Sequence, residues 1–226
     1  GGRLYALMLS SEFIVGVVLL EALALTLLIL VLPLRVFRKD HRKPSIFQAG
    51  YFLALGAGFM FMELYFINEL VMILEDPIIS LTVVLSAILV FSAGGGYVSQ
   101  HLQGRRLAVL LVALIAGLAV LYVILDPVLH AAIGWPKPLQ IVTVLVLMLP
   151  AGFLAGFPFA LGMRRLLTEP VQRAYAWAAN GCTSVLASIL AAQTALSSGI
   201  DRILLASVLA YAVALVMALK IRQRES

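Results

Sequence analysis

The sequence is poor in charged residues and has a single cysteine, and both shortages narrow the class of protein. Only 12% of its 226 residues are charged, whereas 63% are apolar, and the mean hydropathy is +1.08. A water-soluble domain of this length could not bury so much apolar surface. Cys182 stands alone, which excludes a disulfide scaffold. Its position within an apolar run favours a small core residue over a reactive thiol.

Histidine is scarce as well, and this limits the chemistry that we expect. We place His41, His101 and His130 in loops between the apolar runs, so no pair can hold a haem from within a bundle. An intramembrane serine protease is also disfavoured, because it needs a histidine within the membrane and all three histidines are expected in loops. The glycines at 94–96 end an apolar run and open no helix after a strand, which excludes a dinucleotide loop. We expect no metal, no cofactor and no catalytic residue, and an enzyme acting alone is the least favoured class.

Long apolar runs are what the sequence does contain. Seven of them reach the roughly 20 residues needed to cross the hydrocarbon core of a bilayer. The sequence therefore predicts an all-α fold, a polytopic membrane helix bundle with seven transmembrane helices in one domain. The predicted spans are approximately 12–34, 48–74, 78–98, 106–126, 139–162, 174–197 and 201–220. The chain starts without an initiator methionine and shows no signal peptide, so we expect it to be part of a longer protein.

The basic residues behind the net charge of +5 gather in alternate loops. Thirteen of the 16 lysines and arginines fall in the segments 35–47, 99–106 and 163–173 and in the tail from residue 220. The positive-inside rule then places the N-terminus outside and the C-terminus in the cytoplasm. We expect a multi-pass protein of a bacterial-type inner (plasma) membrane. Its expected partner is the lipid bilayer, and no nucleic acid is expected.

Two glutamates lie near the middle of predicted spans, where each costs roughly 2.5–3.5 kcal/mol. These are Glu21 and Glu63, and no span carries a lysine or arginine at its middle to pair with them. Each carboxyl could bind a proton or a cation in a cavity, or it could join helices through a hydrogen bond. The binding hypothesis favours Glu63, because Tyr65, Asn68 and Glu69 follow it in the same helix.

The sixth span carries a polar stripe. Asn180, Ser184 and Ser188 are spaced four residues apart and share one helix face. They could line a polar cavity, or they could belong to close packing, since small residues crowd the same helix. Packing is the favoured interpretation, with Asn180 the best binding candidate. The candidate ligand-binding residues are thus Glu63, Asn68, Glu21, Asn180 and Ser184.

The fifth span contains residues that disturb a helix. Pro150 and Pro158 each remove a backbone hydrogen bond, and the spacing of Gly152 and Gly156 permits close approach of a neighbour. We expect a kink or break here. Transporters place sites at broken helices, although a kink can also serve packing alone. A similar stripe of small residues within 50–58 predicts packing.

Four segments carry a resemblance to a known family. They are Gly58–Glu63, Pro77–Leu81 together with Phe91–Gly94, Gly156–Gly162, and Ala176–Val185. In this order they resemble the C-terminal membrane region of spermidine-synthase-like integral membrane proteins, over roughly residues 50–215. The resemblance implies helices that accompany an aminopropyltransferase-type catalytic domain. The acidic and glycine-rich residues of that domain have no match here, so the resemblance implies ancestry rather than an activity.

Spans two to seven also resemble one half of a major-facilitator transporter. The segment 96–106 lies where that superfamily has a glycine, acidic and basic signature, but the acid is missing. The leading hypothesis is a transporter-like bundle that anchors or serves a partner catalytic domain and binds or passes a cationic amine. The alternative is a structural or accessory subunit of a larger membrane protein complex.

Overall fold

The computed structural model describes residues 16–29, 44–102 and 106–225, and within these ranges every regular element is helical. The helix Gly16–Ile29 comes first. The other elements follow in the order α2 (Ile46–Leu74), α3 (Pro77–Val98), the 3₁₀ turn η1 (Ser99–His101), α4 (Leu107–Ala132), α5 (Lys137–Arg165), α6 (Pro170–Ser198) and α7 (Asp201–Glu225). The predicted all-α class is confirmed.

The number of membrane spans is confirmed only in part. Five helices are long and apolar enough to cross a membrane, namely α2, α3, α4, α5 and α7. A helix occupies each of the seven predicted positions, but α6 carries more polar residues than the other five. The first predicted span is described only over Gly16–Ile29, which is shorter than a crossing requires. Most of the predicted basic loop at 35–47 lies outside the described residues.

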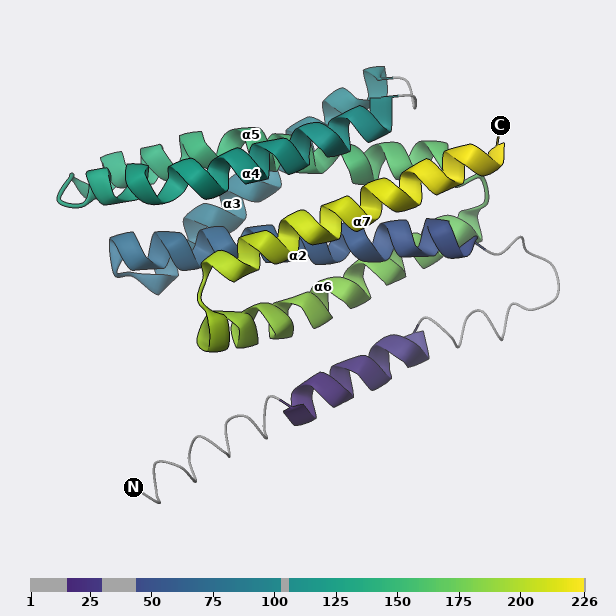
Figure 1. Ribbon diagram of the computed structural model, residues 1–226, viewed down its shortest axis with the longest axis horizontal. Coiled ribbons are helices and arrows are strands. Elements are labelled where there is room, and N and C mark those ends of the chain that lie inside the picture. The colour runs from purple at the N-terminus through teal and green to yellow at the C-terminus, as the bar shows by residue number, and fades with distance from the viewer. Residues whose placement is uncertain (1–15, 30–43, 103–105, 226) are drawn as a thin grey trace.

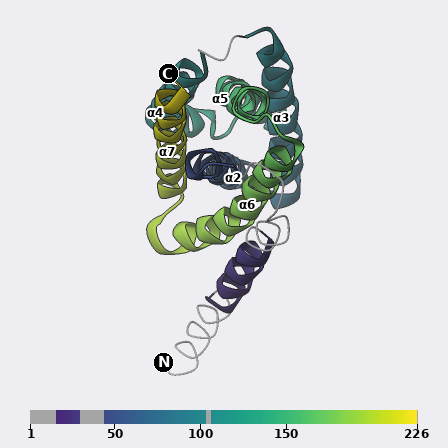
Figure 2. The same cartoon turned by 90° about the vertical axis from the view of Figure 1, so that its right-hand side faces the viewer.

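The bundle is arranged around α2. This helix packs against α3, α5, α6 and α7, whereas α4 packs against α5 and α7. Figures 1 and 2 show α2 enclosed by its neighbours, with the helix Gly16–Ile29 lying apart from the bundle. The three connections α2–α3, α4–α5 and α6–α7 all lie at one end of the bundle (Figure 1).

Capping residues explain where several helices begin. Asp76 accepts hydrogen bonds from the backbone N–H groups of Ile78 and Ile79, at 3.0 and 3.1 Å, and Pro77 fits the first turn of α3. Ser45 and Gln48 form a reciprocal capping box at the start of α2. These short-range signals fix the entry of each chain segment into the bundle.

Large apolar side chains cover much of the outer surface. Leu89, Val90, Val109, Val123 and Val146 are each more than 60% exposed. Soluble monomers rarely expose so much apolar surface, whereas such a surface suits contact with lipid. The length and composition of the five helices and this surface are together consistent with a multi-pass membrane protein.

Candidate ligand cavity

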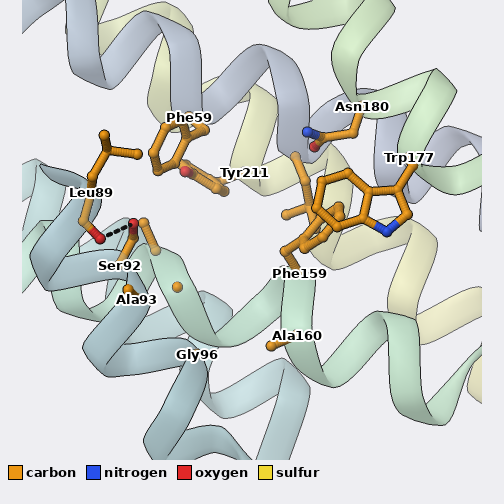
Figure 3. A pocket seen from close by; sticks show the side chains of 13 residues that line it. Phe59, Leu89, Ser92, Ala93, Gly96, Phe159, Ala160, Trp177, Asn180 and Tyr211 are labelled. Carbon is orange, nitrogen blue, oxygen red and sulfur yellow. Dashed lines mark hydrogen bonds between the residues drawn. The ribbon is translucent and has the colours of Figure 1, made fainter. Parts of the chain in front are cut away.

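A cavity of about 410 Å³ lies within the bundle, bordered by five of its helices (Figure 3). Its lining residues are Leu55 and Phe59 of α2, Leu89, Ser92, Ala93 and Gly96 of α3, Ala155, Gly156, Phe159 and Ala160 of α5, Trp177 and Asn180 of α6, and Tyr211 of α7. Leu89 and Trp177 are 61% and 62% exposed, so the lining reaches the outer surface at α3 and α6. The volume and the mostly apolar lining are typical of a small-molecule site.

Small side chains explain why space remains here. Where α3 crosses α5, Gly95 lies against the carbonyl oxygen of Phe153, and Gly156 lies against the carbonyl oxygen of Ser92. A Cβ at either glycine would overlap those backbone atoms, so the two helices touch through their backbones. Beside this crossing, Ala93 and Ala160 provide little bulk, and the cavity forms next to them.

Two polar side chains of the lining have no partner. The hydroxyl of Tyr211 is the one buried side-chain polar atom among the described residues without a hydrogen bond, although the residue is only 1% exposed. The side-chain amide of Asn180 is half-buried and also makes no hydrogen bond within the described chain. Both side chains point into the cavity in Figure 3. Leaving the buried Tyr211 hydroxyl unpaired costs about 1–3 kcal/mol, which a bound ligand could recover.

Aromatic rings form much of the remaining lining. The rings of Phe159 and Trp177 meet edge to face, with centroids 4.9 Å apart, and Phe59 and Tyr211 lie across the cavity from them (Figure 3). The negative faces of such rings attract organic cations. The lining thus combines apolar surface, four aromatic rings and two free polar groups.

Glu63, the leading sequence candidate, does not line this cavity. It is buried on α2, with 7% of its surface exposed, and it makes no hydrogen bond or ion pair with another described residue. It follows the lining residue Phe59 by four positions, which places both on neighbouring turns of one helix face. A role of Glu63 in binding stays a prediction.

The residues of the polar stripe of α6 have different roles. Asn180 lines the cavity, whereas the hydroxyl of Ser184 lies 3.2 Å from the Gly56 carbonyl of α2 and 2.9 Å from the carbonyl of Asn180. Ser184 therefore takes part in packing α6 against α2. Ser188 lines a second hollow with Asn68, whose side-chain nitrogen donates to the Leu64 carbonyl in its own helix, at 2.7 Å.

Of the remaining sequence candidates, Gly156 borders the cavity and the others lie outside its lining. Glu21 is exposed on the helix Gly16–Ile29, which stands apart from the bundle. The helix α5 runs through Pro150 and Pro158 as one continuous element, so its helical structure is not interrupted. A bend at these prolines stays a prediction. Gly152 lies against the side chain of Phe91, and Gly156 both contacts α3 and lines the cavity.

Sequence reasoning missed the aromatic part of the site. Neither Trp177 nor Tyr211 stands out in the sequence, because each lies within a predicted membrane span. The usable signal is that Trp177 and Asn180 are three residues apart and so share a face of α6.

No protein-family model, no curated protein sequence and no solved structure matches the chain.

Proposed function

We propose that this bundle is the transporter-like membrane module of a spermidine-synthase-like protein, and that its cavity binds a cationic amine. One observation carries the proposal. The same mostly apolar cavity contains aromatic rings and two polar groups without a hydrogen-bond partner, the Asn180 amide and the Tyr211 hydroxyl. An ammonium group can donate to the two oxygens, while its carbon chain contacts Phe59 and Phe159. The module would anchor or serve a partner catalytic domain.

The test uses the fluorescence of Trp177. The chain has only one other tryptophan, so a Trp135→Phe background leaves Trp177 as the sole reporter. The protein, held in lipid nanodiscs, is titrated with spermidine and with hexylammonium, and hexanol serves as the neutral counterpart of the latter. We expect a saturable change of emission with the amines and a weaker response to hexanol. Asn180→Ala should weaken amine binding about fivefold, the equivalent of one hydrogen bond.

The matched control carries Trp177→Phe instead, so that Trp135 reports. Trp135 follows α4 and does not line the cavity, and its emission should not change in a saturable way. Equal responses to hexylammonium and hexanol would show that the cavity takes apolar chains without regard to charge, which contradicts the amine proposal. The absence of any saturable response would contradict ligand binding altogether.

The alternative function is a structural subunit whose polar groups only join helices. The Trp177 titration separates the two hypotheses, because a structural subunit gives no saturable response. Glu63→Gln then tests whether this carboxyl takes part in binding, because the substitution keeps the shape of the side chain and removes its charge. If the carboxyl serves amine binding, this variant loses the spermidine response while it stays folded. If the carboxyl only packs helices, the variant binds as before, and Glu63→Leu lowers stability by about 1 kcal/mol.

The proposed orientation has the C-terminus in the cytoplasm. Arg164, Arg165 and Arg222 lie toward one end of the bundle, and Lys137 and Arg202 toward the other. In a Cys182→Ser background, Arg222→Cys should react with a membrane-impermeant thiol reagent only from the cytoplasmic side. Lys137→Cys should react from outside. The reverse labelling pattern would overturn the orientation and leave the cavity proposal untouched.

A further inference from the structure

Three carboxylates from distant parts of the sequence meet near the end of the bundle that holds the α2–α3 connection. Glu69 lies near the end of α2, Asp126 near the end of α4, and Asp201 is the first residue of α7. One oxygen of each lies within 4.8 Å of the others. Glu69 is buried, with 6% of its surface exposed, whereas Asp126 and Asp201 are exposed.

The cluster has no lysine or arginine partner in the part of the chain that the structure describes. His130 is the nearby basic side chain, and it lies in the last turn of α4 rather than in the loop expected from the sequence. Its Nδ1 donates to the backbone carbonyl of Asp126, at 2.9 Å. Three carboxylates this close repel one another unless a proton or a bound cation neutralises part of their charge.

A buried tyrosine provides a second and independent observation. Tyr65 is only 2% exposed and forms no hydrogen bond with any other described residue. It precedes Glu69 by four positions, so both side chains lie on one face of α2. Its hydroxyl lies close enough to interact electrostatically with Glu69, Asp126 and Asp201. The Tyr65 side chain is thus almost fully buried beside three carboxylates and bonds to none of them, which leaves room for a ligand between them.

We propose that Glu69, Asp126 and Asp201 form a binding site for a divalent cation of the calcium type, with the Tyr65 hydroxyl at its inner wall. The cluster offers only oxygen atoms, which hard cations prefer. Calcium binds oxygens at 2.3–2.6 Å, so two oxygens on opposite sides of the ion lie about 5 Å apart, and three oxygens that all lie within 4.8 Å of one another fit one coordination sphere. Because two of the three carboxylates are exposed, water can complete the shell. The site would fasten α2, α4 and α7 together at this end.

The experiment uses terbium(III) as a luminescent probe for calcium sites. The chain in nanodiscs is freed of metal with a chelator, and terbium emission is excited through tyrosine. We expect sensitised emission that calcium displaces with a dissociation constant on the order of 10⁻⁴ to 10⁻³ M, as in extracellular calcium modules. Tyr65→Phe should leave calcium displacement in place, because the proposed ligands are the carboxylates.

Variants of the exposed ligands test the assignment without disturbing the buried core. Asp126→Asn and Asp201→Asn should each weaken terbium and calcium binding about tenfold or more. Glu75→Gln is the matched control, since Glu75 is an exposed carboxyl at the same end of the bundle outside the cluster. Terbium emission that is equal in wild type and both aspartate variants would overturn the proposal. Displacement of terbium by spermidine but not by calcium would overturn the calcium proposal in favour of an amine site. The Trp177 titration reports separately on the cavity.

Discussion

Opposite faces of α5 are joined to their neighbours by different means. Toward α3 the contact is made by backbone atoms, because Gly95 and Gly156 allow the backbones of the two helices to touch. Toward α4 the neighbour presents a stripe of leucines spaced three and four residues apart, which is buried against α5 and α7. The leucines of this stripe are Leu107, Leu111, Leu114, Leu118, Leu121, Leu125 and Leu129.

The difference shows how a bundle can hold together when lipid is the solvent. Lipid is as apolar as leucine, so burial from water does not drive these helices together, and contact area and shape decide. The glycine contact is rigid and tolerates no added atom. The leucine contact is made of side chains that can shift, so it should lose stability gradually as atoms are removed. The following predictions compare the stability lost at the glycine contact with that lost at the leucine contact. The last of them measures the smaller contribution of hydrogen bonds between helices.

The largest effect is expected at the glycine contact. Gly156→Val places a branched side chain against the carbonyl of Ser92 and the N–H of Gly96, so α3 and α5 must move apart. We expect a loss of about 3 kcal/mol in the free energy of unfolding, measured by titration with a denaturing detergent. Gly117→Val is the control, because no atom lies within 4 Å of a Cβ at Gly117. Similar stabilities of the two variants would show that the contact is not rigid.

A smaller effect is expected at the leucine contact. Leu118 is fully buried in the stripe of α4, and Leu118→Ala removes packing contacts without returning apolar surface to water. We expect a loss of about 2 kcal/mol, which corresponds to the cavity left behind. Val123→Ala on the lipid-facing side of the same helix, where the side chain is 69% exposed, should change stability by less than about 0.5 kcal/mol. A loss at Leu118 as large as that of Gly156→Val would remove the distinction between the two contacts.

The smallest effects concern two side chains of α7 that both touch Gly58. Ser207 donates a hydrogen bond to the Gly58 carbonyl, at 2.7 Å, whereas the Tyr211 ring covers Gly58 and its hydroxyl has no partner. Ser207→Ala should cost about 0.6 kcal/mol, the usual value of an interhelical hydrogen bond. Tyr211→Phe should be neutral or stabilising by up to about 1 kcal/mol, because it removes an unpaired buried group. Thermal unfolding of both variants without added amine measures this. A marked loss in the tyrosine variant would show that its hydroxyl has a partner.

The sequence predicts the helices well because apolar runs, caps and prolines act over short distances. Asp76 with Pro77 marks the start of α3, and the small residues within 50–58 predict close packing, which Gly50 and Gly58 provide against α7. The sequence cannot tell which faces meet. Glu69 and Asp201 are far apart in the chain, and only the packing of α2 against α7 brings them together. For the same reason, the cavity residue Tyr211 resembles any other apolar position in the sequence.

The central position of α2 has a consequence for biogenesis. Of the helices in the bundle, α2 is synthesised first, yet two of the helices that cover it, α6 and α7, are the last to be made. The nascent chain must therefore hold Glu69 and the glycines of α2 in the membrane before their final neighbours exist. A translational stop before α6 would leave a half-assembled bundle that exposes these residues to lipid. Quality control in the membrane should recognise and degrade such a product.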